Sequence, residues 1–161
     1  MTEGKVVLVG SSMGGWQSLL FARDHTDRMA GLVTIAAAPD FTEDGYWESF
    51  SDSQKTALEA DGQIELPSDY MEPYIISKKL IEDGRNQLVL RSPLDLPFPV
   101  RMLQGTADTA VSTDCAVKLQ EHASSPDMRL TLIKDADHRF PDGPGLGMID
   151  SAVLEVQGHA G

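Results

Sequence analysis

Residues 5–15 read KVVLVGSSMGG, an apolar run that leads directly into a serine flanked by small residues. The run from Lys5 to Val9 is short and rich in β-branched residues, which is typical of a central parallel strand buried on both faces. Glycine and serine residues then stop the strand, and apolar side chains recur at helical spacing from Gly14 to about His25. A strand, a sharp turn and a helix in so short a stretch predict the start of a β/α unit.

Further apolar runs continue this rhythm along the chain. We expect strands at residues 30–38, 100–104 and 129–134, and helices at residues 113–122 and 145–156. Strands that alternate with helices predict an α/β fold, with a mostly parallel sheet of about four strands flanked by helices.

One segment, Asp40 to Pro97, interrupts the alternation. It is far longer than a simple crossover between parallel strands requires. It holds 13 acidic and 5 basic residues, a balance of −8, and six of the ten aromatic residues. Helical patterns occur near residues 43–50, 53–59 and 73–88. We therefore expect a core made of residues 1–39 and 98–161 and a small helical cap insertion made of residues 40–97.

Composition excludes several classes of partner. The formal charge of −12 disfavours nucleic acid and acidic membrane surfaces, because like charges repel. No apolar stretch approaches the roughly 20 residues that cross a bilayer, and no secretory signal is expected. The single cysteine, Cys115, cannot form an internal disulfide, so a cytoplasmic location is the expectation.

The pattern Gly10-x-Ser12-x-Gly14 matches a nucleophile elbow, in which a strained turn between strand and helix exposes a serine hydroxyl. Small neighbours are needed because the backbone bends tightly. The helix that follows points its N-terminal amides at the same place, so the Met13 amide is the expected donor to an oxyanion.

A serine nucleophile needs a base, and histidine has the suitable pKa. His138 lies on a loop four residues after an expected strand, at the strand end where open α/β sheets collect their active sites. We expect the other three histidines, His25, His122 and His159, to be ordinary exposed residues.

A carboxylate should orient that histidine and stabilise its charged form. Asp108 follows the strand at residues 100–104, and the order Ser12, Asp108, His138 is that of an α/β-hydrolase triad. Asp40 is a rival at another strand end, and Asp137 is a weaker one because neighbouring loop side chains seldom face each other.

Other chemistries find little support in the sequence. The histidines are scattered, no paired cysteines occur, and no phosphate-binding glycine loop follows a strand, so we expect neither a metal nor a cofactor. Cys115 lacks an elbow of its own and is expected to be a half-buried helix residue.

The residues 10–16 (GSSMGGW), 105–108 (GTAD) and 137–139 (DHR) resemble the serine α/β-hydrolase superfamily. Residues 81–86 (IEDGRN) and 99–101 (PVR) are similar to bacterial relatives of the mitochondrial palmitoyl-protein thioesterase that also cleaves acyl glucuronides. The resemblance implies Ser12 as nucleophile, His138 as base, Asp108 as acid and the Met13 amide in the oxyanion hole.

Members of that superfamily build about eight strands and place the nucleophile after the fifth, whereas the elbow here begins at residue 10. The resemblance therefore implies that N-terminal strands, with the loop that donates the second oxyanion hydrogen bond, are missing. Loss of one such donor typically costs about 3 kcal/mol in the transition state. The strand from Lys5 to Val9 would then be an open apolar edge through which the protein self-associates.

The sequence thus predicts a hydrolase of small-molecule esters or thioesters with an apolar acyl group, acting through an acyl-enzyme. We expect Trp16, together with Tyr46, Trp47 and Phe50 of the cap, to contact the acyl group. One alternative is an inactive or weak remnant that acts as a self-associating module. A prolyl-oligopeptidase-like peptidase is a lesser alternative, because such peptidases lack a cap between these strands.

Overall fold

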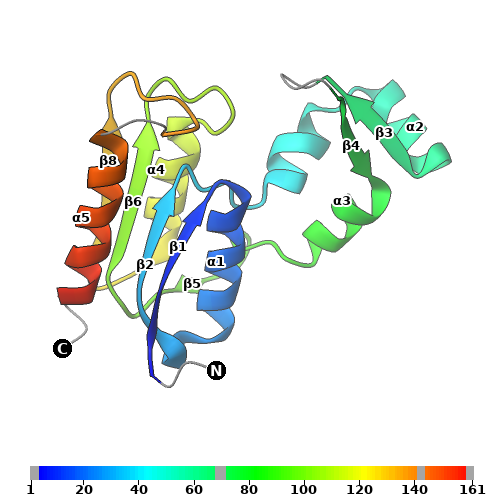
Figure 1. The fold of residues 1–161 in the computed structure, drawn as a ribbon. Coiled ribbons are helices and arrows are strands. Elements are labelled where there is room, and N and C mark those ends of the chain that lie inside the picture. Colours follow the sequence, from blue (N-terminus) through cyan, green and yellow to red (C-terminus); the bar gives the residue numbers. More distant parts are fainter. Residues whose placement is uncertain (1–3, 68–71, 141–143, 159–161) are drawn as a thin grey trace. The chain divides into compact units, whose positions relative to one another are not determined.

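A computed structural model of the chain describes residues 4–67, 72–140 and 144–158 (Figure 1). It divides the chain into two units, a core unit of residues 1–39 and 89–161 and a cap unit of residues 40–88. The cap therefore ends at Leu88 rather than at Pro97.

The residues between these two boundaries belong to the core unit for a physical reason. A two-residue strand there, β5 (Leu94–Asp95), pairs in parallel with another short strand, β7 (Ala123–Ser124). Leu94 and Leu96 are also buried, so this segment packs its apolar side chains into the core.

The core unit contains one parallel sheet. Its strands are β1 (Val6–Ser11), β2 (Met29–Ile35), β6 (Val100–Gly105) and β8 (Met128–Ile133), and they lie in the order β1-β2-β6-β8. Every neighbouring pair in this sheet is parallel. The α/β class and the sheet of four strands are confirmed.

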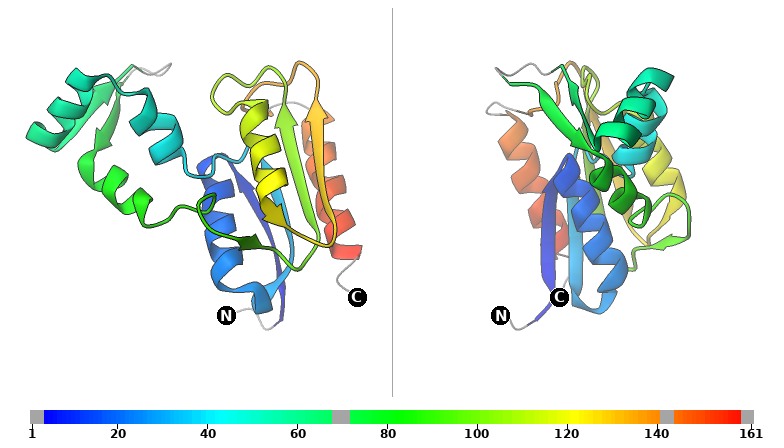
Figure 2. Two further views of the ribbon diagram at one scale, coloured as in Figure 1. Left: turned by 180° about the vertical axis from the view of Figure 1, so that it is seen from behind. Right: turned by 90° about the vertical axis from the view of Figure 1, so that its right-hand side faces the viewer.

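Helices cover both faces of this sheet. Helix α5 (Pro144–Gly158) lies on one face, and α1 (Met13–Asp24) and α4 (Thr113–His122) lie on the other (Figure 2). A short 3₁₀ turn, η1 (Thr26–Arg28), leads from α1 into β2. Because side chains of a strand point alternately to the two faces, each inner strand is buried on both sides.

The α5 side of the sheet holds one continuous apolar cluster. Val33 and Ile35 of β2 and Leu103 of β6 pack there against Ala152 and Val156 of α5. These side chains are almost completely removed from water. Burial of each of the larger ones stabilises the fold by about 1.5–3 kcal/mol. This cluster fixes α5 on the sheet, and it includes Phe140, two residues after His138.

Strand β2 ends earlier than its apolar run predicts. The run continues to Ala38, but Ala36 has a φ of 46°, which a strand cannot contain. The Ala36 amide instead donates to the Leu103 carbonyl at 2.9 Å. The chain thereby turns at the carboxyl edge of the sheet and passes next to Ser12.

The cap unit mixes helices with a hairpin. It contains a π-helical turn, η2 (Phe41–Trp47), then α2 (Asp52–Asp61), β3 (Gln63–Leu66), β4 (Tyr74–Ser77) and α3 (Lys78–Arg85). Strands β3 and β4 pair antiparallel. The cap is therefore not purely helical. The prediction of a helix over residues 73–88 is wrong at its N-terminal end, because Tyr74–Ser77 form β4 and α3 begins at Lys78.

The hairpin forms because it completes a small core. Ile64 of β3 and Ile76 of β4 lie directly opposite each other and are both buried, together with Phe50, Leu58 and Ile81. Each strand is four residues long, too short for its alternation to stand out from the flanking helical pattern.

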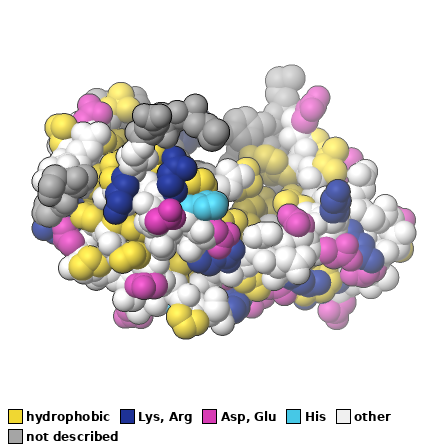
Figure 3. Space-filling model, turned by 90° about the horizontal axis from the view of Figure 1, so that it is seen from below, with side chains coloured by type: hydrophobic (Ala, Val, Ile, Leu, Met, Phe, Trp, Pro, Cys, Tyr) yellow, Lys and Arg dark blue, Asp and Glu magenta, His cyan; other side chains and the backbone are white. Residues whose placement is uncertain are grey.

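Acidic and basic side chains are interspersed on the face of the molecule drawn in Figure 3, rather than gathered in one acidic patch. No helix in the described part of the chain combines the length and apolar character needed to span a bilayer.

Candidate active site

Ser12 occupies the turn between β1 and α1. Its backbone has a φ of 53° and a ψ of −121°, a strained conformation for a residue with a side chain. The neighbouring strand holds it there: the Ser12 amide donates to the Ile35 carbonyl at 2.9 Å, and the Ala38 amide donates to the Ser12 carbonyl at 3.1 Å. Strain that is fixed by hydrogen bonds on both sides is typical of a functional residue.

Two glycines make this turn possible by close packing. A β-carbon on Gly10 would overlap the Gly14 carbonyl, and one on Gly15 would lie 2.6 Å from the Ala37 β-carbon. At Gly14, by contrast, a β-carbon would meet no described atom within 4 Å. The steric requirement thus lies at Gly10 and Gly15 rather than at the last glycine of the sequence pattern.

The structure brings together the three side chains that the sequence singled out. His138 Nε2 lies 3.0 Å from Ser12 Oγ, and His138 Nδ1 lies 2.8 Å from Asp108 Oδ2. Both distances are within hydrogen-bond reach, which is the geometry that transfer of a proton from serine to histidine requires. The Asp108 side chain is 0% exposed and that of His138 is 30% exposed, so the base faces solvent and the acid does not.

Asp108 sits in a shell of hydrogen-bond donors. The amides of Ala110 and Val111 each donate to Oδ1 at 2.8 Å, and the Gln104 side chain donates to Oδ2 at 3.2 Å. Burial raises the pKa of the Asp108 carboxyl, but hydrogen bonds from Val111, His138 and Ala110 outweigh burial and hold that pKa below its usual range. The carboxylate therefore stays charged and can stabilise a protonated imidazole.

Backbone contacts tie the loop of Asp108 to the loop of His138. The Thr106 amide donates to the Ile133 carbonyl at 2.9 Å, and the Ala107 amide donates to the Ala136 carbonyl at 3.0 Å. The Asp135 amide in turn donates to Thr106 Oγ1 at 2.9 Å. The relative position of acid and base is thus set by the main chain.

Neither rival acid bonds His138 in the described part of the chain. Asp137 Oδ1 accepts the Arg139 amide at 2.9 Å, within its own loop. The backbone carbonyl of Asp40 accepts the amides of Glu43 and Asp44 at the start of η2. Among the residues that the structure describes, the carboxylate hydrogen-bonded to His138 is that of Asp108.

The remaining histidines and the cysteine lie elsewhere. The His25 ring packs 4.6 Å from Phe21 at the end of α1, and His122 Nε2 lies 2.8 Å from the Ser92 carbonyl oxygen. His159 lies outside the described residues. Cys115 is half-buried in α4, with its Sγ 3.9 Å from the Ala37 carbonyl oxygen.

Met13 is the first residue of α1, directly after Ser12. An amide at this position has no acceptor within its own helix, so it is available to an anion. Its role as oxyanion donor stays a prediction.

The four aromatic residues expected at the substrate differ in exposure. Trp16 of α1 and Phe50 of the cap are buried, whereas Tyr46 and Trp47 are half-buried against the cap core. The Arg85 guanidinium lies 4.4 Å from the Trp47 ring centroid, which holds that ring in place. Contact of these side chains with substrate stays a prediction.

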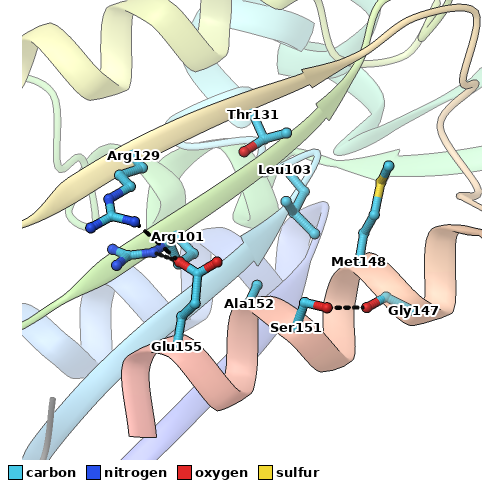
Figure 4. Close-up of a pocket in the computed structure, with 9 residues that line it drawn as sticks. All are labelled: Arg101, Leu103, Arg129, Thr131, Gly147, Met148, Ser151, Ala152 and Glu155. Carbon is cyan, nitrogen blue, oxygen red and sulfur yellow. Dashed lines mark hydrogen bonds and ion pairs between the residues drawn. The ribbon is translucent and has the colours of Figure 1, made fainter. Parts of the chain in front are cut away.

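A separate pocket lies between α5 and strands β6 and β8 (Figure 4). Its volume is about 430 Å³, and neither Ser12 nor His138 lines it. The buried Arg101 at its rim is bound by Asp127 at 2.8 Å and by Glu155 at 2.6 Å. Arg129, which also lines the pocket, pairs with the same two carboxylates at 3.2 and 3.5 Å, so both arginines of the pocket already have acidic partners.

Metal ligands do not gather in the part of the chain described. No group of three or more His, Cys, Asp or Glu side chains is arranged there to hold a metal ion.

Comparison with known proteins agrees with this geometry. The model of the alpha/beta hydrolase fold family matches residues 2–86, and the chain belongs to that family.

Individual relatives are also similar along most of the chain. It is 32% identical over 158 residues to the mitochondrial palmitoyl-protein thioesterase ABHD10 of Rattus norvegicus, an alignment that covers 97% of this chain and 53% of the relative. A crystal structure from Agrobacterium vitis S4 superposes with a TM-score of 0.90 at 37% identity, covering 94% of this chain and 61% of that one.

The structure of alpha/beta hydrolase domain-containing protein 10 from mouse gives a TM-score of 0.89 at 26% identity, covering 100% of this chain and 65% of that one. The chain spans about half the length of the curated relatives it matches.

Proposed function

We propose that the protein is a serine hydrolase that cleaves carboxylic esters or thioesters of an apolar acyl group through an acyl-enzyme intermediate. One observation carries the proposal: His138 Nε2 lies 3.0 Å from Ser12 Oγ, and Asp108 holds the other nitrogen of the same ring at 2.8 Å. A hydroxyl is a weak nucleophile at neutral pH, and this arrangement supplies the base that activates it.

In the first half of the reaction, Ser12 Oγ attacks the acyl carbon while His138 Nε2 accepts the hydroxyl proton. Asp108 accepts a hydrogen bond from Nδ1–H, which fixes the ring and stabilises the imidazolium. The Met13 amide donates to the oxygen that becomes negatively charged. Collapse of the tetrahedral intermediate breaks the C–O or C–S bond, and His138 returns its proton to the leaving alcohol or thiol.

The second half repeats these steps with water as the nucleophile. His138 removes a proton from water, the new hydroxyl attacks the acyl carbon, and the bond from that carbon to Ser12 Oγ breaks. His138 then protonates Ser12 Oγ, and the carboxylic acid leaves.

Two observations support the proposed substrate class, one in the cap and one among the relatives. Tyr46 and Trp47 are aromatic and half-buried, so they suit an apolar acyl chain better than a charged one. The relative from rat is named a palmitoyl-protein thioesterase, which agrees with a long apolar acyl group on a thioester. Oxyesters need the same Ser12 and His138 chemistry, so we propose both bonds as substrates.

Hydrolysis of 4-nitrophenyl butyrate by the purified protein and by Ser12→Ala tests the proposal. We expect the wild type to exceed the variant by at least about 1000-fold, because removal of a nucleophile leaves only binding and oxyanion stabilisation. A parallel assay with the 4-nitrothiophenyl ester compares a thioester with the same acyl group. Equal rates for the wild type and Ser12→Ala on both substrates would rule out the hydrolase.

One observation favours a second candidate, a self-associating module. Strand β1 is an edge of the described sheet, and Val9 on it is 49% exposed. An apolar edge strand with unpaired backbone groups is a template for pairing with another chain. Sedimentation velocity over a range of concentrations tests it: we expect a dimer, and replacement of Val9 by Lys should return the protein to a monomer. A monomer at all concentrations would exclude this candidate.

A further inference from the structure

Gln104 is a buried polar residue in the core unit that the triad alone does not explain. It lies next to the end of β6, and only 1% of it is exposed. Its side-chain amide has three acceptors: the Val111 carbonyl oxygen at 2.9 Å, the Gly105 carbonyl oxygen at 3.1 Å and Asp108 Oδ2 at 3.2 Å.

These three acceptors lie along one loop. Residues 105–111 leave β6, carry Asp108 and end at Val111, so the acceptors lie at the beginning, the middle and the end of the loop. The Gln104 amide has two protons, so one of them is shared between two of these acceptors. Among the described residues, the side chains that hydrogen-bond to Asp108 Oδ2 are those of Gln104 and His138. Gln104 therefore contacts the same carboxylate oxygen as His138 Nδ1.

The side-chain oxygen of Gln104 argues against a role in packing alone. Oε1 is buried, and no described protein group bonds it. A buried polar atom without a partner destabilises the fold, and an apolar side chain of the same length would avoid that cost.

On the basis of the proposed hydrolase activity, we infer that Gln104 is a positioning residue: its amide holds the Asp108 carboxylate at the distance and angle that His138 needs. It acts through Asp108 and His138 and does not touch the substrate. Both acylation and deacylation use His138, so the loss of Gln104 slows both.

The test replaces Gln104 by Met, which keeps the length of the side chain but removes the donor. With 4-nitrophenyl butyrate we expect kcat to fall about tenfold or more while KM stays within about twofold, because small displacements of a catalytic group reduce the rate of chemistry rather than binding. The control is Met102→Leu, a volume-conserving change at a buried position of the same strand. It should leave kcat unchanged.

A second readout does not depend on turnover. The proton on His138 Nδ1, bonded to Asp108, should give a downfield NMR signal that His138→Gln removes. In Gln104→Met we expect that signal to shift or to broaden through exchange with water, while Met102→Leu leaves it in place. An unchanged signal together with an unchanged kcat would overturn the inference, and so would equal effects of the two substitutions.

The rates of the wild type and of Ser12→Ala separate failure of the proposed hydrolase activity from failure of the role of Gln104. If the wild type is no faster than Ser12→Ala, the activity is absent, and a positioning role in catalysis is overturned with it. If the wild type is active and Gln104→Met matches it in both readouts, the hydrolase stands and only the role of Gln104 is lost.

Discussion

The Ala136 carbonyl oxygen packs so closely against Gly105 that a β-carbon on residue 105 would overlap it. Gly105 ends β6 shortly before Asp108, and Ala136 lies two residues before His138. The acid and the base are therefore held together where two backbones meet, and the space between these backbones is a structural requirement of the site.

Substitution of Gly105 by Ala should separate these two loops. We expect the free energy of unfolding to fall by about 1–3 kcal/mol from overpacking, and kcat to fall at least tenfold as His138 moves away from Asp108. Urea denaturation and hydrolysis of 4-nitrophenyl butyrate measure the two effects. Gly147→Ala is the control, because a β-carbon there meets no described atom within 4 Å. A Gly105→Ala protein with normal stability and activity would contradict this account.

The glycines after Ser12 should differ from each other in a way that the GxSxG pattern does not indicate. Gly14→Ala has room, and alanine favours a helix over glycine by up to about 1 kcal/mol, so its stability should hold or rise. Gly15→Ala should lose about 1–3 kcal/mol against Ala37. Thermal unfolding of both variants measures the difference, and the reverse order of stability would refute the packing described for α1.

The stability supplied by Asp108 should depend on pH. Its pKa in the folded protein is below the ordinary value of about 3.9, because the hydrogen bonds to its charged form outweigh burial. A group with a depressed pKa stabilises the folded state at pH values above its ordinary pKa. This stabilisation is lost as the pH falls through the pKa that the group has in the folded protein. The difference in unfolding free energy between the wild type and Asp108→Asn should therefore shrink from about pH 5 to about pH 3. A constant difference across that interval would show that the charge of Asp108 adds nothing.

The ion pairs of Arg101 should support the fold and not the reaction. The Arg101 side chain is 4% exposed and bonds Asp127 and Glu155. Asp127→Asn leaves a buried guanidinium partly uncompensated and should cost about 1–3 kcal/mol, with no change in kcat. Glu155→Gln should cost less, because the Glu155 side chain is 47% exposed and solvent screens its charge. Chemical denaturation measures the free energy of unfolding of both variants. A larger loss of that free energy for Glu155→Gln than for Asp127→Asn would contradict this view.

Much of the core unit could be predicted because its strands are continuous apolar runs. The four runs correspond to β1, β2, β6 and β8, and the glycine-rich stop after Val9 predicts the elbow. The end of β2 could not be predicted, since the apolar run continues through Ala36 into a turn with positive φ. Alanine is equally apolar in a strand and in a turn, so the hydrophobic pattern does not show where the strand ends.

The site itself was only partly predictable. Chain order and strand ends favoured Asp108, but they left Asp40 as a rival until distances were known. Gln104 carries no sequence signal, because an isolated glutamine at the end of a strand is ordinary, and only its three acceptors distinguish it. The β3–β4 hairpin was missed because four-residue strands do not show a period.

Covalent labelling with a fluorophosphonate tests the central claim most directly, since such probes react with a serine that a base has activated. Peptide mass spectrometry of the labelled wild type should find the probe on Ser12, and His138→Gln should abolish labelling although Ser12 is intact. A probe found on another residue, or equal labelling of Ser12 in the wild type and in His138→Gln, would contradict the activation of Ser12 by His138.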